Sequence, residues 1–222
     1  GLAAVVVPLF APMADPLRQA GIHGVNFSLD TLQPDIFRRI TRTDQFAAAR
    51  AGIDKALEAG FPSVKVNCVL MRGINDGEAA ALAALAKDAP LEVRFIEMMP
   101  IGYGKQFKTI NHKELLEEMH REYPGLAKDH TEHGYGPAVY YRIPGALGSV
   151  GLISAIHGKF CDECNRVRLT SQGFLKTCLC YEDGVDLRPV LRSADTGAED
   201  GPDGGGQELC RVMEQTIYGK PG

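Results

Sequence analysis

The segment VNFSLD, residues 25–30, is the first of three β-rich segments that decide the fold, and VKVNCVL (64–70) and VRFIEMMP (93–100) follow it. Each is rich in the branched and aromatic residues that favour strands. Each interval between them holds a helical pattern. TDQFAAARAGIDKALEAG at 43–60 has Thr43 or Asp44 as its expected N-cap, and NDGEAAALAALAKDA at 75–89 is expected to start at Asn75 or Asp76. Strands that alternate with helices predict right-handed βα units around a parallel sheet, which makes the fold class α/β.

Polar side chains recur on one face of these predicted strands. Asn26 and Ser28 alternate with apolar residues in the first segment, Lys65 and Asn67 do so in the second, and Arg94 does so in the third. Helices cover the outer face of a parallel sheet, so polar positions on its other face must line something. We expect a hydrated lumen or cleft with ligands at the carboxyl ends of the strands. The alternative is an antiparallel sheet with one wet face.

The flanks of this βα region are organised differently. Residues 1–20 admit a strand broken by Pro8, a helix-entry loop or sequence foreign to the fold. NHKELLEEMHREY (111–123) predicts an amphipathic helix, with Asn111 and Glu114 at the spacing of a capping box.

Two β segments come next, AVYYRIPG (138–145) and GSVGLIS (148–154), and we expect them to be antiparallel. Beyond them, DLRPVLRS (186–193) reads as a short helix or turn. A Gly-rich linker then leads to a terminal helix at 206–220.

Three thiols in FCDECNRVRLTSQGFLKTCL (160–179) have the spacing of metal ligands. Cys161 and Cys164 form a CxxC, and Cys178 follows a thirteen-residue gap that reads as a turn between two short strands. Such a hairpin can return the third sulfur to one ion or cluster. A zinc ribbon closed by Cys180 and a set of buried thiols are the alternatives, and spacing alone does not separate zinc from iron.

Two arginines follow the CxxC directly. Arg166 and Arg168 alternate with Val167 and Leu169, so on a strand both guanidinium groups leave the same face. Guanidinium groups beside a metal centre can bind an anionic ligand through paired hydrogen bonds, whereas a structural zinc site does not require them. The alternative is a solvated strand face with surface charges.

This cysteine and arginine segment resembles the second-cluster motif of the GTP 3′,8-cyclases, radical S-adenosylmethionine enzymes of molybdenum cofactor biosynthesis. GVNFSLDTL, VKVNCVLMRGIN and VRFIEMMPIG resemble later strands of the same family in the family's order. The resemblance implies the C-terminal half of an incomplete (βα)6 TIM-like barrel, followed by a small α+β cluster-binding region. We therefore expect a partial barrel at 1–107, a cluster and GTP region at 108–195, and a linker with a terminal helix at 196–222.

The resemblance also implies the site residues. Cys161, Cys164 and Cys178 would hold a [4Fe-4S] cluster with one open iron. GTP would be contacted by a second group, which comprises Lys65, Arg166, Val167 and Arg168. S-adenosylmethionine would be contacted by Ser28 and Met99, and Arg94 would pair with a ligand carboxylate or phosphate. Cys180 departs from the family pattern, and we expect it to be a bystander or an alternate ligand.

The implied activity is the conversion of GTP to 3′,8-cyclo-7,8-dihydro-GTP, a lyase reaction. The family begins it at a first [4Fe-4S] cluster held by CxxxCxxC, a motif that this chain lacks, and the chain opens with Gly1 rather than Met. We therefore expect a carboxyl-terminal part that binds GTP and a cluster but is not competent alone. The expected partners are GTP and, by family resemblance, a second copy in a homodimer and the downstream cyclic pyranopterin monophosphate synthase.

Composition sets the remaining bounds. The net charge of −4 argues against a general nucleic-acid or membrane-surface binder. Six cysteines in 222 residues suit ligands in a reducing compartment, the mitochondrial matrix or the bacterial cytoplasm, better than a disulfide scaffold. No apolar run is long enough for a transmembrane helix. Two other functions remain open, a non-catalytic zinc or iron–sulfur scaffold and a different radical S-adenosylmethionine enzyme with an auxiliary cluster.

Overall fold

The chain forms two compact units, Gly1–Lys159 and Phe160–Gly222. The computed structural model describes residues 2–4, 10–100, 102–131, 133–134, 136–154, 156, 167–178, 182–194 and 204–220. The first unit extends to Lys159 because strands beyond residue 107 return to its sheet.

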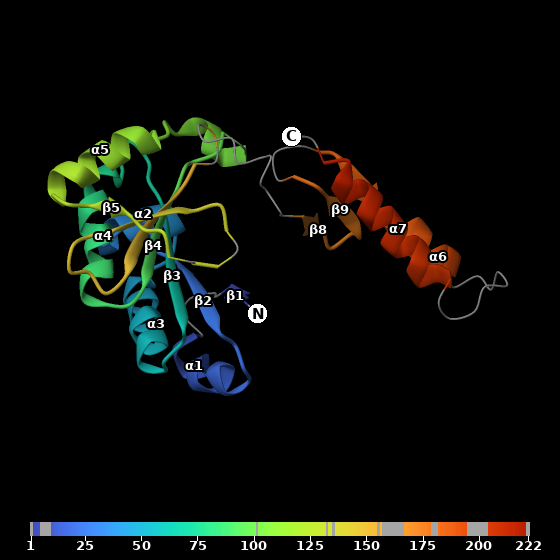
Figure 1. Ribbon diagram of the computed structural model, residues 1–222, viewed down its shortest axis with the longest axis horizontal. Helices are drawn as coiled ribbons and strands as arrows, with labels where there is room; N and C mark the ends of the chain where they lie inside the picture. The colour runs from blue at the N-terminus through green and yellow to red at the C-terminus, as the bar shows by residue number, and fades with distance from the viewer. Residues whose placement is uncertain are drawn as a thin grey trace. The chain divides into compact units, whose positions relative to one another are not determined.

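A seven-stranded sheet organises the first unit (Figure 1). Its strands are β1 (Leu2–Ala4), β2 (Gly24–Ser28), β3 (Ser63–Val69), β4 (Glu92–Ile96), β5 (Ala127–Lys128), β6 (Val139–Arg142) and β7 (Ser149–Ile153). They lie in the order β1-β2-β3-β4-β7-β6-β5, in which β1 to β4 and β7 run parallel while β6 is antiparallel to both of its neighbours. The predicted α/β class with a mainly parallel sheet is confirmed, as is the antiparallel pairing of the two later β segments.

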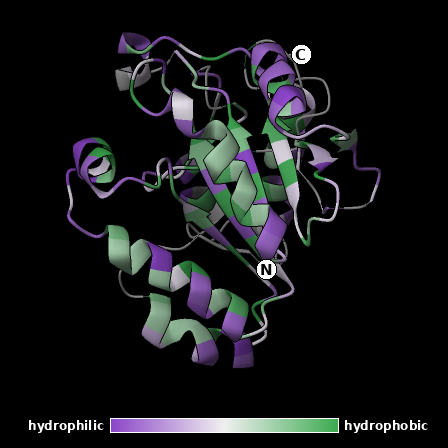
Figure 2. Ribbon diagram, turned by 90° about the vertical axis from the view of Figure 1, so that its left-hand side faces the viewer, coloured by the Kyte–Doolittle hydropathy of each residue, from purple (hydrophilic) through white to green (hydrophobic). Residues whose placement is uncertain are grey.

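Helices cover one face of this sheet. They are α1 (Phe10–Gln19), α2 (Pro34–Thr41), α3 (Phe46–Glu58), α4 (Ala79–Asp88) and α5 (His112–Glu122), with short 3-10 turns η1 (Asp76–Glu78) and η2 (Gly102–Gln106). Helix α3 packs on β2 and β3, and α4 packs on β4 and β7. Figure 2, seen from this side, shows mostly hydrophobic strands behind helices of mixed character.

The core lies between the helices and the sheet face that they cover. Its largest fully buried side chains include Phe27 and Phe95, and Phe10 of α1 meets Phe27 edge to face with ring centroids 5.1 Å apart. A Cβ on Gly52 of α3 would lie 3.2 Å from the Phe27 ring, so glycine lets this helix approach the aromatic pair. The other face of β2, β3 and β4 is therefore left for the polar residues.

Two predicted helix starts are wrong. Helix α3 begins at Phe46 after Gln45 rather than after Thr43 or Asp44, and the Thr43 hydroxyl lies 3.0 Å from that of Thr41 instead of capping. Helix α4 begins at Ala79 rather than near Asn75, because the residues between them form η1.

The start of α5 is as predicted in one respect only. The Asn111 side chain accepts a hydrogen bond from Lys113 N, as an N-cap should. Glu114 does not complete a capping box, since its carboxylate accepts a hydrogen bond from Arg72. The first turn of α5 is thus tied to the loop after β3.

The second unit holds a three-stranded antiparallel sheet in the order β10-β9-β8. Its elements are β8 (Arg168–Leu169), β9 (Phe174–Lys176), β10 (Gly184–Asp186), α6 (Arg188–Ala194) and α7 (Gly204–Tyr218). Gly173, at φ 79°, closes the turn between β8 and β9, where its N–H donates to Thr170 O. The predicted hairpin inside the cysteine segment is confirmed, and so are the two helices that follow it.

Candidate functional site

The face of the sheet that the helices leave uncovered carries polar side chains in rows. The strand register places Asn26 of β2 beside Lys65 of β3, and Lys65 beside Glu92 of β4. One step closer to the carboxyl ends, a second row places Asn67 of β3 beside its neighbours on β2 and β4, Ser28 and Arg94.

Arg94 links the two rows across three strands. Its Nε donates to Asn67 Oδ1 at 2.8 Å and its Nη2 donates to Asn26 Oδ1 at 2.9 Å. Both acceptors are neutral amides, so these contacts fix the guanidinium plane without using its charge. An anionic group of a ligand is therefore a suitable further partner for Arg94.

Lys65 lies in the first row with its side chain only 9% exposed. Its ammonium is 2.7 Å from Glu92 Oε2 and donates to the backbone carbonyl of His133 at 2.8 Å. It also lies 5.9 Å from the centre of the Tyr140 ring. A buried charge needs such partners, because leaving it unpaired would cost several kcal/mol, on the order of 3–5.

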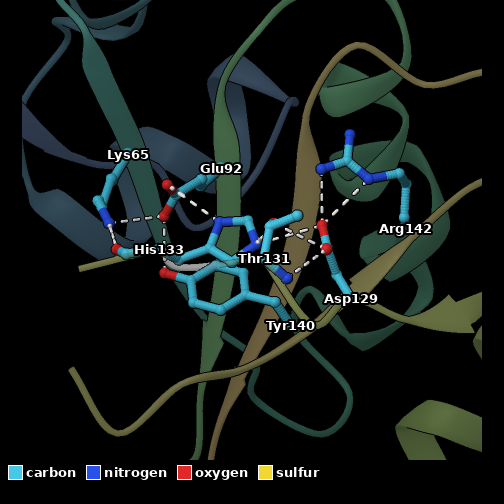
Figure 3. A network of polar contacts seen from close by, with 7 residues as sticks. All are labelled: Lys65, Glu92, Asp129, Thr131, His133, Tyr140 and Arg142. Carbon is cyan, nitrogen blue, oxygen red and sulfur yellow. Dashed lines mark hydrogen bonds and ion pairs between the residues drawn. The ribbon is translucent and has the colours of Figure 1, made fainter. Parts of the chain in front are cut away.

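Tyr140 and His133 close over this ion pair (Figure 3). The Tyr140 hydroxyl donates to Glu92 Oε2 at 2.6 Å, and His133 Nδ1 lies 3.5 Å from Glu92 Oε1. The two rings stack with centroids 3.9 Å apart. Burial, reinforced by the hydrogen bond to the Glu92 carboxylate, raises the pKa of Tyr140 well above its usual range.

The network ends at Asp129, whose side chain is 5% exposed. Asp129 lies 3.2 Å from His133 Nε2 and accepts hydrogen bonds from Thr131 and from both Nε and Nη2 of Arg142. Burial alone would raise the pKa of Asp129, but the hydrogen bonds from Thr131 and Arg142 outweigh burial and lower it strongly. Thr131, His133 and Arg142 are thereby linked through Asp129.

Three of the sequence-predicted residues meet on this face. Ser28, Lys65 and Arg94 come from adjacent strands, and Ser28 is exposed at the carboxyl end of β2. Met99 lies beyond the end of β4 and is half-buried. The structure brings the first three together and places Met99 just past them along the chain.

The predicted cluster residues belong to the second unit. Val167 and Arg168 are exposed at β8, and Cys178 is half-buried just after β9. The other predicted residues of this motif, Cys161, Cys164 and Arg166, lie outside the described residues, as does Cys180. Within the described part of the chain, no three His, Cys, Asp or Glu side chains gather as a metal site.

A cavity of about 460 Å³ opens beside the carboxyl ends of the strands in the first unit. Its walls come from the end of α2, from the loop after β3 and from the segment after η2. The lining residues are Arg39, Ile40, Arg42, Met71, Ile74 and Phe107. Its size lies within the range of small-molecule sites. The predicted ligand contacts Ser28, Lys65 and Arg94 are not among its lining residues, so the expected cleft along the polar face stays a prediction.

Two polar contacts hold the chain just after β7. Glu97, 2% exposed, accepts a hydrogen bond from Ile156 N at 2.8 Å, and His112 Nδ1 lies 2.8 Å from the Ser154 hydroxyl. These two contacts anchor the backbone that leads toward the cysteine segment.

Sequence reasoning did not identify Glu92, Tyr140, His133 or Asp129. The sequence could have identified Glu92, because this residue precedes Arg94 by two positions and therefore shares a strand face with it. The other three come from β6 and the segment that follows β5, which no local pattern connects to Lys65.

Comparisons with known proteins show the family to which the chain belongs. A family model described as Molybdenum Cofactor Synthesis C matches residues 91–221, and one described as Radical SAM superfamily matches residues 4–86. The GTP 3′,8-cyclase of Desulforamulus reducens is 42% identical over 216 residues, which are 96% of this chain and 64% of that protein. The GTP 3′,8-cyclase of Geobacter sulfurreducens is 44% identical over 84% of this chain and 58% of its own length.

A mouse protein named molybdenum cofactor biosynthesis protein 1 is 43% identical over 90% of this chain and 30% of its own length. The chain thus spans about three fifths of the length of the two bacterial relatives. None of the helices in the described ranges combines the length and hydrophobicity that crossing a bilayer requires. The Molybdenum Cofactor Synthesis C model covers more than half of the chain, and the chain belongs to that family of radical S-adenosylmethionine proteins.

Proposed function

We propose that this chain provides the GTP-binding and second-cluster part of a GTP 3′,8-cyclase in molybdenum cofactor biosynthesis. The observation that supports this most is the meeting of Ser28, Lys65 and Arg94 on one polar sheet face. Two relatives, 42% and 44% identical, are named GTP 3′,8-cyclase. The proposed reaction is the conversion of GTP to 3′,8-cyclo-7,8-dihydro-GTP.

The proposed division of roles follows the two units. In the first unit, Lys65 contacts GTP, Ser28 and Met99 contact S-adenosylmethionine, and Arg94 offers its charge to a ligand carboxylate or phosphate. The sheet is the later part of an incomplete (βα)6 barrel.

In the second unit, Cys161, Cys164 and Cys178 hold a [4Fe-4S] cluster. Three thiolates form a soft donor set that suits an iron–sulfur cluster and leaves one iron open. Arg166, Val167 and Arg168 contact GTP, and the two guanidinium groups offset the charge of its phosphates.

S-adenosylmethionine and its own cluster supply the radical chemistry in this superfamily. The residues of this chain bind the nucleotide and fix its orientation, so that the ribose and the base are held in position for ring closure. A polar face with few mobile groups serves this purpose, because Arg94 is already fixed by two amides.

The test is binding. The chain is reconstituted anaerobically with iron and sulfide, its iron and acid-labile sulfide are counted, and GTP affinity is measured by calorimetry. Arg166→Ala with Arg168→Ala should lower GTP affinity at least tenfold, since each charge-assisted contact contributes roughly 1.5–3 kcal/mol. The matched control is Arg211→Ala, which removes an exposed arginine that pairs with Glu208 within α7 and should leave affinity unchanged.

A chain that takes up only zinc and shows no GTP affinity would contradict the proposal and favour a scaffold role. The division into regions 1–107, 108–195 and 196–222 stays a prediction. So do the homodimer, the link to cyclic pyranopterin monophosphate synthase and the mitochondrial or cytoplasmic location.

A further inference from the structure

Lys65 is held by more groups than a lysine that simply attracts phosphate would need. An ammonium group has three N–H donors. Glu92 Oε2 and the His133 carbonyl take two of them, and among the described residues no other group accepts from Lys65 Nζ. One donor remains, and its direction is set by the other two.

The charge of Lys65 is also balanced before any ligand arrives. Glu92 Oε2 lies 2.7 Å from Nζ, and both side chains are largely buried, at 9% and 17% exposure. The Tyr140 hydroxyl donates to the same carboxylate oxygen at 2.6 Å and is neutral. Lys65 and Glu92 therefore present almost no net charge to a group that binds beside them.

Tyr140 and His133 keep the carboxylate in this position. The Tyr140 ring stacks on the His133 ring, and His133 in turn lies 3.2 Å from Asp129 (Figure 3). The Glu92 carboxylate is thus held in place by the Tyr140 hydroxyl as well as by the Lys65 ammonium.

We propose that Glu92 determines how Lys65 recognises a nucleotide: it cancels the lysine charge and leaves a single, directed hydrogen-bond donor. The proposal rests on the role of Lys65 as a GTP contact under the proposed function. In this arrangement Lys65 reads the position of one acceptor atom on GTP, while the total charge of the triphosphate is left to the arginines. Glu92 is a positioning residue, because it acts through Lys65.

The test uses Glu92→Gln in the reconstituted chain, with GTP titrated by calorimetry at several NaCl concentrations. Glutamine keeps the shape and an acceptor oxygen but removes the charge, so Lys65 becomes an uncompensated cation. We expect GTP to bind about threefold to tenfold more tightly at low salt, as one unscreened charge a few ångströms from the ligand implies. The gain should shrink toward zero near 1 M NaCl, where the screening length falls to about 3 Å.

The matched control is Glu58→Gln. It removes the same charge by the same substitution at the exposed end of α3, where Glu58 pairs with Lys55 rather than with Lys65. Its effect on GTP affinity and on the salt dependence should stay within about twofold, because an exposed charge is screened by solvent and salt.

A second comparison, between Lys65→Met and the double variant Lys65→Met with Glu92→Gln, tests the same idea even if Glu92→Gln alone does not fold. Lys65→Met alone leaves Glu92 as an uncompensated anion, whereas Lys65→Met with Glu92→Gln is neutral again. The double variant should therefore bind GTP more tightly than Lys65→Met, with the salt dependence of the wild-type chain. A carboxylate with a purely structural role would instead make the double variant the weaker binder.

The outcomes separate the two proposals. If the wild-type chain does not bind GTP, the proposed function fails and this inference fails with it. If the wild-type chain binds GTP but Glu92→Gln has wild-type affinity and salt dependence, or the double variant binds no better than Lys65→Met, only this inference is overturned.

Discussion

Gly151 of β7 lies where the polar face is most crowded, and its replacement by alanine tests the packing there. A Cβ at this position would lie 2.9 Å from Tyr140 Cε1 and 3.1 Å from Arg94 Cγ. The first distance is shorter than carbon atoms tolerate, so one of the two side chains must move. Tyr140 is not free to do so, because its hydroxyl is bonded to Glu92 and its ring is stacked on His133.

The expected cost follows from two opposing effects. Overpacking a well-ordered site costs about 1–3 kcal/mol. Alanine in place of glycine within a strand returns about 0.5–1 kcal/mol, because the unfolded chain loses freedom. We therefore expect Gly151→Ala to lower the free energy of unfolding by about 0.5–2 kcal/mol, which shifts the urea midpoint by about 0.25–1 M if m is about 2 kcal/mol/M.

The assay is urea unfolding followed by far-ultraviolet circular dichroism, with Gly77→Ala as the control. A Cβ on Gly77 meets nothing within 4 Å, so this variant should stay within about 0.5 kcal/mol of the wild-type chain. In a Tyr140→Ala background the cost of Gly151→Ala should fall, since the clashing ring is gone. An unchanged midpoint for Gly151→Ala, or an undiminished cost without the Tyr140 ring, would refute the packing described for this face.

Two further predictions concern single groups. Burial raises the pKa of Asp30 above its ordinary value, although the hydrogen bond from Val69 N opposes this, so the folded state holds the Asp30 proton more tightly than the unfolded state. Protonation therefore stabilises the fold, and the wild-type chain should gain stability relative to Asp30→Asn as pH falls from about 6 to 4, which urea midpoints at each pH would show; an identical pH dependence in both chains would contradict it. Asn111→Ala removes the N-cap of α5 and should cost about 1 kcal/mol in the same assay, while Asn111→Asp, which can still accept from Lys113 N, should cost much less; equal losses would argue against the cap.

The sequence predicted the parallel strands because their patterns are local. Alternation in VNFSLD and VKVNCVL is visible without a partner, and the structure places these strands within two residues of the predicted bounds. Strand β7 has no alternation, since all five of its residues are buried. Its parallel pairing with β4 depends on a contact between residues more than 50 positions apart, and no local pattern specifies it.

The start of α4 was mispredicted because tertiary contacts use the side chain that was expected to cap it. Asn75 looked like an N-cap, but its Nδ2 donates to the carbonyls of Asp30 and Val69 and its Oδ1 accepts from Met71 N. It thereby joins the ends of β2 and β3 instead of capping a helix. A side chain that hydrogen-bonds to neighbouring strands cannot be distinguished from a helix cap by the sequence of its own segment.

The candidate site divides in the same way. Ser28, Lys65 and Arg94 could be grouped from the sequence because each occupies an alternating strand position. The residues that surround Lys65 could not, because Tyr140 and His133 reach it from a hairpin far along the chain. Sequence periodicity therefore predicted the strand positions and missed the partners that hold them.

The long chain separation between β4 and its sheet neighbour β7 has a consequence for the folding rate. Strands β1 to β4 can pair through short βα crossovers, whereas β7 must close a loop that spans η2, α5, β5 and β6 before it reaches β4. Closing that loop carries an entropic penalty before any long-range contact repays it, so we expect this step to limit the folding rate. Tyr140 belongs to β6 within the same segment, so the contacts around Lys65 and Glu92 are completed only in molecules that have finished folding.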